Sequence, residues 1–128
     1  MRILLDTHTL IWFVENDPRL SLNARLLLED VTNELWLSIA SVWEMAIKVN
    51  LQKLGLGMPF EQAITLRLTQ NGISVLSIEL PHTFLVAQLP LHHRDPFDRM
   101  ICAQSLVEGL PLLSSDHVFD LYGVNLVW

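Results

Sequence analysis

The sequence predicts an α/β domain in which a parallel sheet is covered by helices on both faces. Short apolar runs alternate along the chain with amphipathic segments of helical periodicity. Strands that alternate with helices form a parallel sheet with helices on its two faces. The 128 residues contain no internal repeat, low-complexity tract or flexible linker, so we expect one domain spanning 1–128.

The chain opens with a short strand and two helices. Residues 3–5 form an apolar run that ends at Asp6. A helical segment is expected over 9–15, because Asp17-Pro18 stops it. Ser21 is the expected N-cap of the next helix.

The apolar run 34–39 predicts the second strand. We expect Ser41 to cap the helix that follows, which carries Trp43 and fades near Gly55. A further helix is expected from Pro59 to about residue 70, where Asn71-Gly72 stops it.

The last part of the chain provides three more strands, at residues 73–78, 112–113 and 124–128. A short helix is expected over 81–88. Asp95-Pro96 indicates a helix start, because it places a capping acid before a proline at the first helical position, and Gly109 ends that helix.

The balance of charged and apolar residues limits the classes of binding partner that we expect. The net charge is −6, whereas nucleic-acid binders usually carry a basic surface. A cluster of carboxylates that binds a cation would account for part of this imbalance. Hydrophobic residues make up 51% and charged residues 17%, more apolar than a lone small domain requires, so we expect a homodimer, a tight protein partner, or both.

The cysteine count and the lengths of the apolar stretches bear on the cellular compartment and on membrane association. Cys102 is the only cysteine, which excludes an internal disulfide and makes the cytoplasm the expected location. No stretch is long and apolar enough to span a membrane, and the first residues lack the pattern of a signal peptide. We expect Cys102 to lie in the core.

Four acids fall where chemistry collects in such a sheet, at the carboxyl ends of strands. Asp6 ends the first strand, Glu44 lies about one helical turn after the second, and Asp116 follows the fourth; Asp98 lies in the first turn of the helix before that strand. Clustered carboxylates raise one another's pKa, and a divalent cation removes the conflict. Mg²⁺ and Mn²⁺ prefer oxygen ligands and activate water for phosphodiester hydrolysis.

Each acid also has a structural interpretation. Asp6 and Asp116 can cap the segments that follow them, and the helix dipole favours Asp98 whatever its function. Glu44 taken alone is more simply a solvated helix residue. Asp95 is the clearest structural acid, which we assign first to capping and second to the site.

Four segments, LLDTHTLIW, SIASVWEMAIK, HHRDPFDRMICAQS and LLSSD, resemble the four motif regions of PIN-domain nucleases, and most closely those of the VapC-like toxins of toxin–antitoxin pairs. The resemblance extends from Met1 to about Tyr122. It implies a three-layer α/β/α sandwich with a mostly parallel five-stranded sheet. It also implies Mg²⁺- or Mn²⁺-dependent cleavage of RNA and a cognate antitoxin that blocks the site.

Carried over position by position, the resemblance assigns the metal and catalytic roles to four acids, Asp6, Glu44, Asp98 and Asp116. Ser114 stands where the family often has a hydroxyl residue, which would donate a hydrogen bond to the carboxylates. Thr7 and Ser38 are expected to support the site in the same way, and Asp95 is expected to support it by shaping the local field.

Basic and histidine residues surround these acids. Lys48, Lys53, Arg94 and Arg99 flank the Glu44 and Asp98 regions, where they either contact phosphates or face solvent, with Arg99 alternatively paired to an acid. His92-His93 is expected to form a polar loop bordering the RNA path. One cysteine and scattered histidines do not make a zinc site.

Other α/β classes fit less well. Receiver domains have an adjacent acidic pair after the first strand and a late lysine, but Thr7 follows Asp6 and no lysine follows Lys53. A haloacid-dehalogenase-like phosphatase needs Asp-x-Asp there, and His8 occupies the third position. A non-catalytic PIN-like interaction module and an RNA-processing nuclease without a toxin role remain open.

Overall fold

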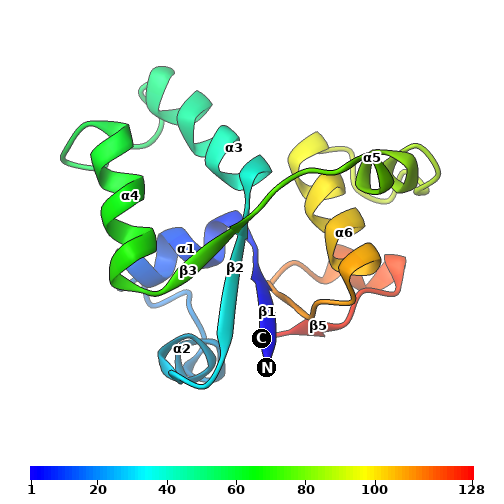
Figure 1. Ribbon diagram of the computed structural model, residues 1–128, viewed down its shortest axis with the longest axis horizontal. Helices are drawn as coiled ribbons and strands as arrows, with labels where there is room; N and C mark the ends of the chain where they lie inside the picture. Colours follow the sequence, from blue (N-terminus) through cyan, green and yellow to red (C-terminus); the bar gives the residue numbers. More distant parts are fainter.

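The computed structural model describes residues 1–128 and contains a five-stranded sheet between two layers of helices (Figure 1). Every strand pairs in parallel with its neighbours, in the order β3-β2-β1-β4-β5, so the central strand is the first in the chain. The predicted α/β class and five-stranded sheet are confirmed, and the sheet is parallel throughout. The strands are β1 (Arg2–Leu5), β2 (Glu34–Ser38), β3 (Ile73–Leu76), β4 (Leu112–Leu113) and β5 (Leu126–Val127).

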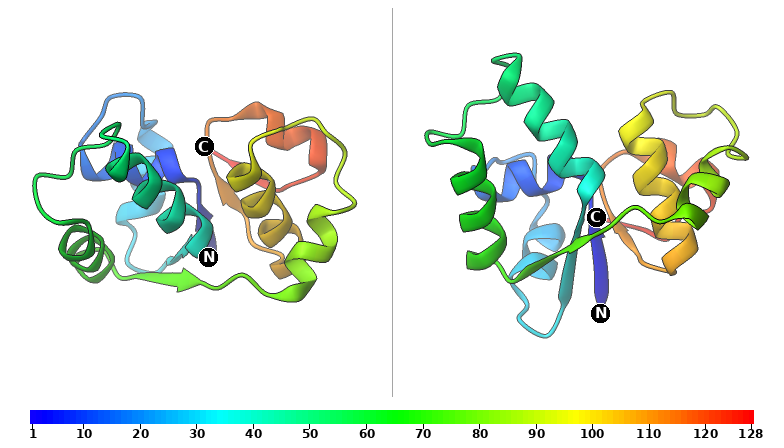
Figure 2. Two further views of the ribbon diagram at one scale, coloured as in Figure 1. Left: turned by 90° about the horizontal axis from the view of Figure 1, so that it is seen from above. Right: turned by 45° about the horizontal axis from the view of Figure 1, so that its top comes forward.

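Six α-helices and one 3₁₀ helix connect the strands. They are α1 (Thr7–Val14), α2 (Leu22–Glu29), α3 (Ile39–Asn50), α4 (Phe60–Gln70), α5 (Leu80–Val86), α6 (Pro96–Glu108) and the 3₁₀ helix η1 (His117–Tyr122). Figures 1 and 2 show α1 to α4 on one side of the sheet and α5 and α6 on the other. None of the helices combines the length and apolar character needed to cross a membrane.

Alternating residues of the strands form two cores. Ile3 and Leu5 of β1 pack into the core beneath α1 to α4, whereas Leu4 between them packs into the core beneath α6 and η1. The central strand is therefore buried on both faces, as expected for a parallel sheet. Cys102 lies in the second core, where burial raises the pKa of its thiol to about 11, so its predicted core role is confirmed.

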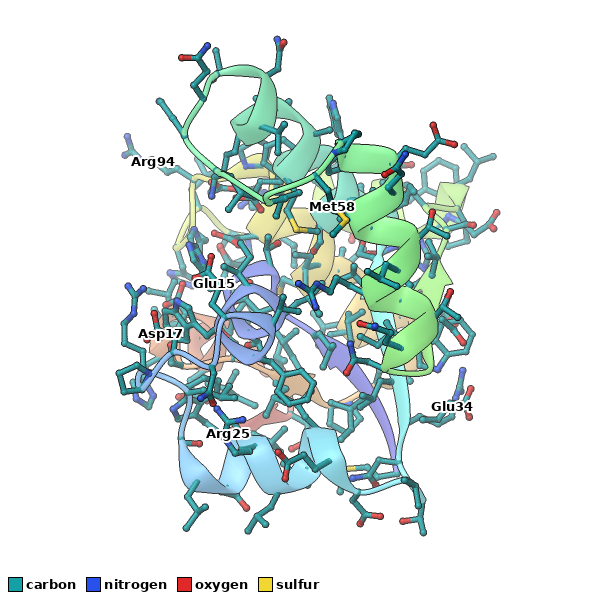
Figure 3. The ribbon with its side chains drawn as sticks, turned by 90° about the vertical axis from the view of Figure 1, so that its left-hand side faces the viewer. Glu15, Asp17, Arg25, Glu34, Met58 and Arg94 are labelled. Carbon is teal, nitrogen blue, oxygen red and sulfur yellow. The ribbon has the colours of Figure 1, made fainter.

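The layer of α1 to α4 contains a largely apolar pocket of about 270 Å³. It is lined by residues of α1, α3 and α4 and by the loop between α3 and α4. Figure 3 views this side of the molecule, with Glu15 at the end of α1 and Met58 shortly before α4.

The start of α3 differs from the sequence prediction. Ser38 caps the helix by accepting a hydrogen bond from the Ala40 amide (3.0 Å), so the expectation that Ser41 would be the cap is wrong. The reason is that α3 begins directly after β2, with no loop between them. Ser41 is instead buried within the first turn of the helix.

Replacing Ser38 with Ala tests this cap. Loss of the side-chain acceptor should lower the free energy of unfolding by about 1 kcal/mol, measured by urea denaturation. Ser74→Ala, at an exposed strand position, is the matched control and should change it by less than about 0.5 kcal/mol. Equal effects of the two substitutions would contradict the capping role.

Candidate metal centre

Three of the four predicted acids meet at one edge of the sheet. Asp6 follows β1 directly, and Asp116 lies three residues beyond the adjacent parallel strand β4, so both leave the carboxyl ends of neighbouring strands. Asp98 approaches from the first turn of α6. The three side chains line an open pocket of about 290 Å³, together with His8, Trp12, Arg19 and Ser115.

Asp6 is the most deeply buried carboxylate of the pocket, with 5% of its surface exposed. Its Oδ2 accepts a hydrogen bond from Ser114 Oγ (2.7 Å), while Oδ1 is buried and has no hydrogen-bond partner. Burial raises the pKa of Asp6, and the Ser114 hydrogen bond opposes that rise. Although Asp6 stands at the N-cap position of α1, its side chain makes no capping hydrogen bond, so it is available to the pocket.

Asp98 lies beside Asp6 in an environment that disfavours its charge. Burial raises the pKa of Asp98 to about 7, and the charges of Asp6 and Asp95 add to the rise while His93 opposes it. The pKa values of Asp6 and Asp98 are both raised chiefly because burial disfavours the charged carboxylate. Carboxylate oxygens are the ligands that Mg²⁺ and Mn²⁺ prefer, so the donor set fits such an ion.

Asp116 uses its two carboxylate oxygens differently. Oδ1 accepts the Val118 amide (3.0 Å) and caps η1, whereas Oδ2 lies 2.8 Å from His93 Nε2. His93 Nε2 is also 3.2 Å from Asp98 Oδ2. His93 was expected in a polar loop bordering the RNA path, and its contact with the acids was not predicted.

Glu44 lies outside the lining of this pocket. Thr7 Oγ1 donates to Glu44 Oε1 (2.9 Å), and Lys48 Nζ pairs with Glu44 Oε2 at 3.0 Å. The glutamate is 7% exposed, and its charge makes only a small contribution to the raised pKa values of Asp6 and Asp98. The charge of Glu44 therefore reaches Asp6 and Asp98, but the glutamate is paired with a lysine one helical turn away.

The supporting residues divide into two groups. Ser114 and Thr7 contact acids of the predicted site, as described above. Ser38 and Asp95 act as helix caps, and Asp95 accepts hydrogen bonds from the Phe97 and Asp98 amides. Asp95 thus fixes the helix turn that carries Asp98 and adds negative charge beside it.

The interpretation of Arg99 as a phosphate contact or acid partner is wrong. Its guanidinium donates to four backbone carbonyls, those of Val86, Leu89, Pro90 and His93, at 2.9 to 3.2 Å. Arg99 therefore holds the loop before α6 in place. Arg19, which the sequence analysis did not single out, lines the pocket and lies 4.8 Å over the Trp12 ring.

With this geometry established, a family model decides the assignment: the PIN domain model matches residues 3–125. The chain belongs to the PIN domain family. A curated relative, the ribonuclease VapC16 of Mycobacterium tuberculosis, is 39% identical over 70 residues, which cover 52% of this chain and 50% of the relative. The matched part is thus about half the length of that relative.

Solved structures share the PIN fold over the whole chain. A chain of VapBC2 from Rickettsia felis, in a complex bound to a promoter DNA fragment, has a TM-score of 0.73 at 16% identity and covers 99% of this chain and 98% of its own. A chain of DNA-bound VapBC from Salmonella typhimurium has a TM-score of 0.73 at 17% identity and covers 99% and 97%. FitAcB from Neisseria gonorrhoeae has a TM-score of 0.68 at 21% identity and covers 98% and 96%.

Asp98→Asn should stabilise the metal-free PIN domain at neutral and alkaline pH. The pKa of Asp98 is higher in the folded than in the unfolded chain, so its contribution to stability is present at low pH and is lost as pH rises from about 4 through 7. The variant should therefore gain on the order of 1–2 kcal/mol at pH 8 and little near pH 4.

Thermal unfolding of both proteins in a chelator, from pH 4 to pH 8, measures this difference. Asp120→Asn, an exposed acid in η1, is the control and should show no such dependence. A variant that is less stable than the unsubstituted chain at pH 8 would contradict the raised pKa of Asp98.

Proposed function

We propose that this PIN domain is a metal-dependent endoribonuclease in which Asp6, Asp98 and Asp116 hold Mg²⁺ or Mn²⁺ and Glu44 supports them. The observation that carries the proposal is the buried Oδ1 of Asp6, the only buried carboxylate oxygen in the chain without a hydrogen-bond partner. Buried polar atoms are normally satisfied, and a cation in the adjacent pocket would satisfy this one.

The bound ion would activate water and stabilise negative charge on the phosphate. The residues of the chain would set up that chemistry. Ser114 fixes the orientation of Asp6, and the Val118 amide fixes that of Asp116. Thr7 and Lys48 hold Glu44 beside them, so a phosphate entering the pocket would meet oriented groups that need no rearrangement.

Unpaired RNA is the substrate class that we propose, because single strands and loops enter a carboxylate pocket more easily than a stiff duplex. The net charge of −6 opposes binding of a polyanion, so local basic groups must offset it. Arg19 is one such group, since it lines the pocket and its side chain is 66% exposed. In this structure the Arg19 guanidinium donates to the carboxylate of Asp17, two residues earlier in the sequence. A phosphate would take the place of that carboxylate.

We further propose that the chain is the toxin of a toxin–antitoxin pair acting on RNA in the cytoplasm. The support is the likeness to VapC16 and to VapBC complexes. The apolar pocket between α1, α3 and α4 and the exposed apolar side chains would give an antitoxin and a second copy of the chain surfaces to cover. An arginine of the antitoxin inserted among the carboxylates would block the site.

This partner proposal has its own test. A tight protein partner should co-purify with the chain from the native host, and sedimentation should show a homodimer. Recovery of RNA cleavage activity without any such partner would contradict the toxin role and favour an RNA-processing nuclease.

Asp6→Asn should abolish RNA cleavage. The substitution removes a ligand charge while preserving shape, so we expect at least a 100-fold loss, beyond the roughly 10- to 100-fold typical of groups that only orient ligands. The measurement is cleavage of a panel of labelled RNAs by purified protein, with Mg²⁺, with Mn²⁺ and with chelator. Asp120→Asn, outside the pocket, should cleave normally.

Three outcomes have distinct meanings. Metal-dependent cutting that is lost in Asp6→Asn supports the site. Equal cutting by both proteins indicates a contaminating nuclease. Absence of cutting under every condition, with no metal binding by calorimetry, would contradict the proposal and favour a non-catalytic interaction module.

A further inference from the structure

His93 occupies a position among the acids that the carboxylate-only description of the site does not explain. Its Nε2 lies 2.8 Å from Asp116 Oδ2 and 3.2 Å from Asp98 Oδ2. One potential ligand atom from each of these three residues falls within 4.8 Å of the others. The imidazole therefore enters the carboxylate cluster by its edge, with a nitrogen directed at two acids from different elements.

Several interactions hold His93 in its position beside Asp98 and Asp116. Its backbone amide donates to Tyr122 Oη (2.6 Å), and that hydroxyl donates to the Pro90 carbonyl (2.8 Å). The Arg99 guanidinium holds the same loop through the carbonyls of Pro90 and His93, and through two more from α5 and the segment after it. The backbone on both sides of the imidazole is therefore fixed from α6 and from η1.

The ring itself is also packed. The imidazole lies 5.6 Å, centroid to centroid, from the buried ring of Phe119, and 18% of the His93 side chain is exposed. A solvated loop histidine would need neither this packing nor the fixed backbone. The arrangement is that of a preorganised ligand.

We propose that His93 Nε2 is a direct ligand of the divalent cation, together with Asp98 and Asp116, so that the centre has mixed nitrogen and oxygen donors. This inference rests on the proposed metal dependence and goes beyond it by naming a ligand outside the four acids. Neighbouring ligands of an octahedral ion with bonds of about 2.1 Å lie about 3.0 Å apart, and the two His93 distances bracket that spacing.

The buried carboxylate oxygen of Asp6 gives a second reason to expect a cation in the pocket that Asp98 and Asp116 line. Asp6 Oδ1, which is buried and unpartnered, belongs to a residue lining the same pocket as Asp98 and Asp116. His93 cannot satisfy it, because the nitrogen that reaches the acids is already shared between the other two aspartates. A cation among these groups would give Asp6 Oδ1 a partner and would explain why the His93 nitrogen lies among the acids.

The nitrogen donor has a consequence for metal choice. Mg²⁺ prefers oxygen ligands, whereas imidazole suits the transition metals, whose affinities for nitrogen ligands rise along the first row. A centre that includes His93 should therefore favour Mn²⁺ over Mg²⁺ more strongly than a carboxylate-only centre. The alternative role of His93 is that of a hydrogen-bond donor which orients Asp116 without touching the ion.

The test compares the unsubstituted chain with His93→Gln and with the control His117→Gln. His117 follows Asp116 in sequence, but its side chain is 88% exposed. Calorimetry measures Mn²⁺ and Mg²⁺ affinity, and pulsed electron paramagnetic resonance detects nitrogen coupled to bound Mn²⁺. We expect a histidine nitrogen signal in the chain and the control. In His93→Gln we expect loss of that signal and at least about 100-fold weaker Mn²⁺ binding, beyond the roughly 10- to 100-fold typical of groups that only orient ligands.

Tyr122→Phe provides a second variant, which loosens the loop without removing the ligand. It should keep the nitrogen signal and weaken Mn²⁺ binding less than His93→Gln does. Bound Mn²⁺ without nitrogen coupling in the unsubstituted chain would overturn the role of His93 and leave the proposed nuclease standing. Absence of any Mn²⁺ binding by the folded chain would overturn both.

Discussion

The crowding of buried and partly buried carboxylates at one edge of the sheet is the constraint on which the rest of the site depends. Two unit charges 4 Å apart interact by about 4 kcal/mol at an effective dielectric constant near 20, a substantial part of the stability of a small domain. The surrounding residues relieve that repulsion in part: Ser114 donates to Asp6, Lys48 pairs with Glu44, and His93 lies between Asp98 and Asp116. The pKa values of Asp6 and Asp98 are still raised, first because both carboxyls are buried and, for Asp98, also because of the charges of Asp6 and Asp95.

The fold holds these charges together because its interior is rigid on both sides of the central strand. Asp6 and Ser114 are 108 residues apart, yet they meet because β1 and β4 are adjacent parallel strands. Apolar cores on both faces fix those strands, so the acids cannot simply move apart. The free energy of the packed cores thus maintains an arrangement that is unfavourable by itself, as is common at functional sites.

Much of this arrangement was predictable from local signals, and the remainder depended on tertiary contacts. Acids at strand ends located Asp6 and Asp116, and Asp95-Pro96 located the helix that carries Asp98. The Glu44–Lys48 pair has the i,i+4 spacing of helical ion pairs, a pattern that can be read from the sequence. The position of His93 was not readable, because it depends on a loop held by Arg99 and Tyr122, whose targets are backbone atoms that leave no sequence pattern.

The most direct test of the central claim is a crystal structure of the protein soaked in Mn²⁺, with anomalous scattering recorded at the manganese edge. We expect an anomalous peak within bonding distance of carboxylate oxygens of Asp98 and Asp116, on the side of the pocket facing Asp6. A map in which the carboxylates are ordered as described and no manganese lies among them would contradict a metal centre here.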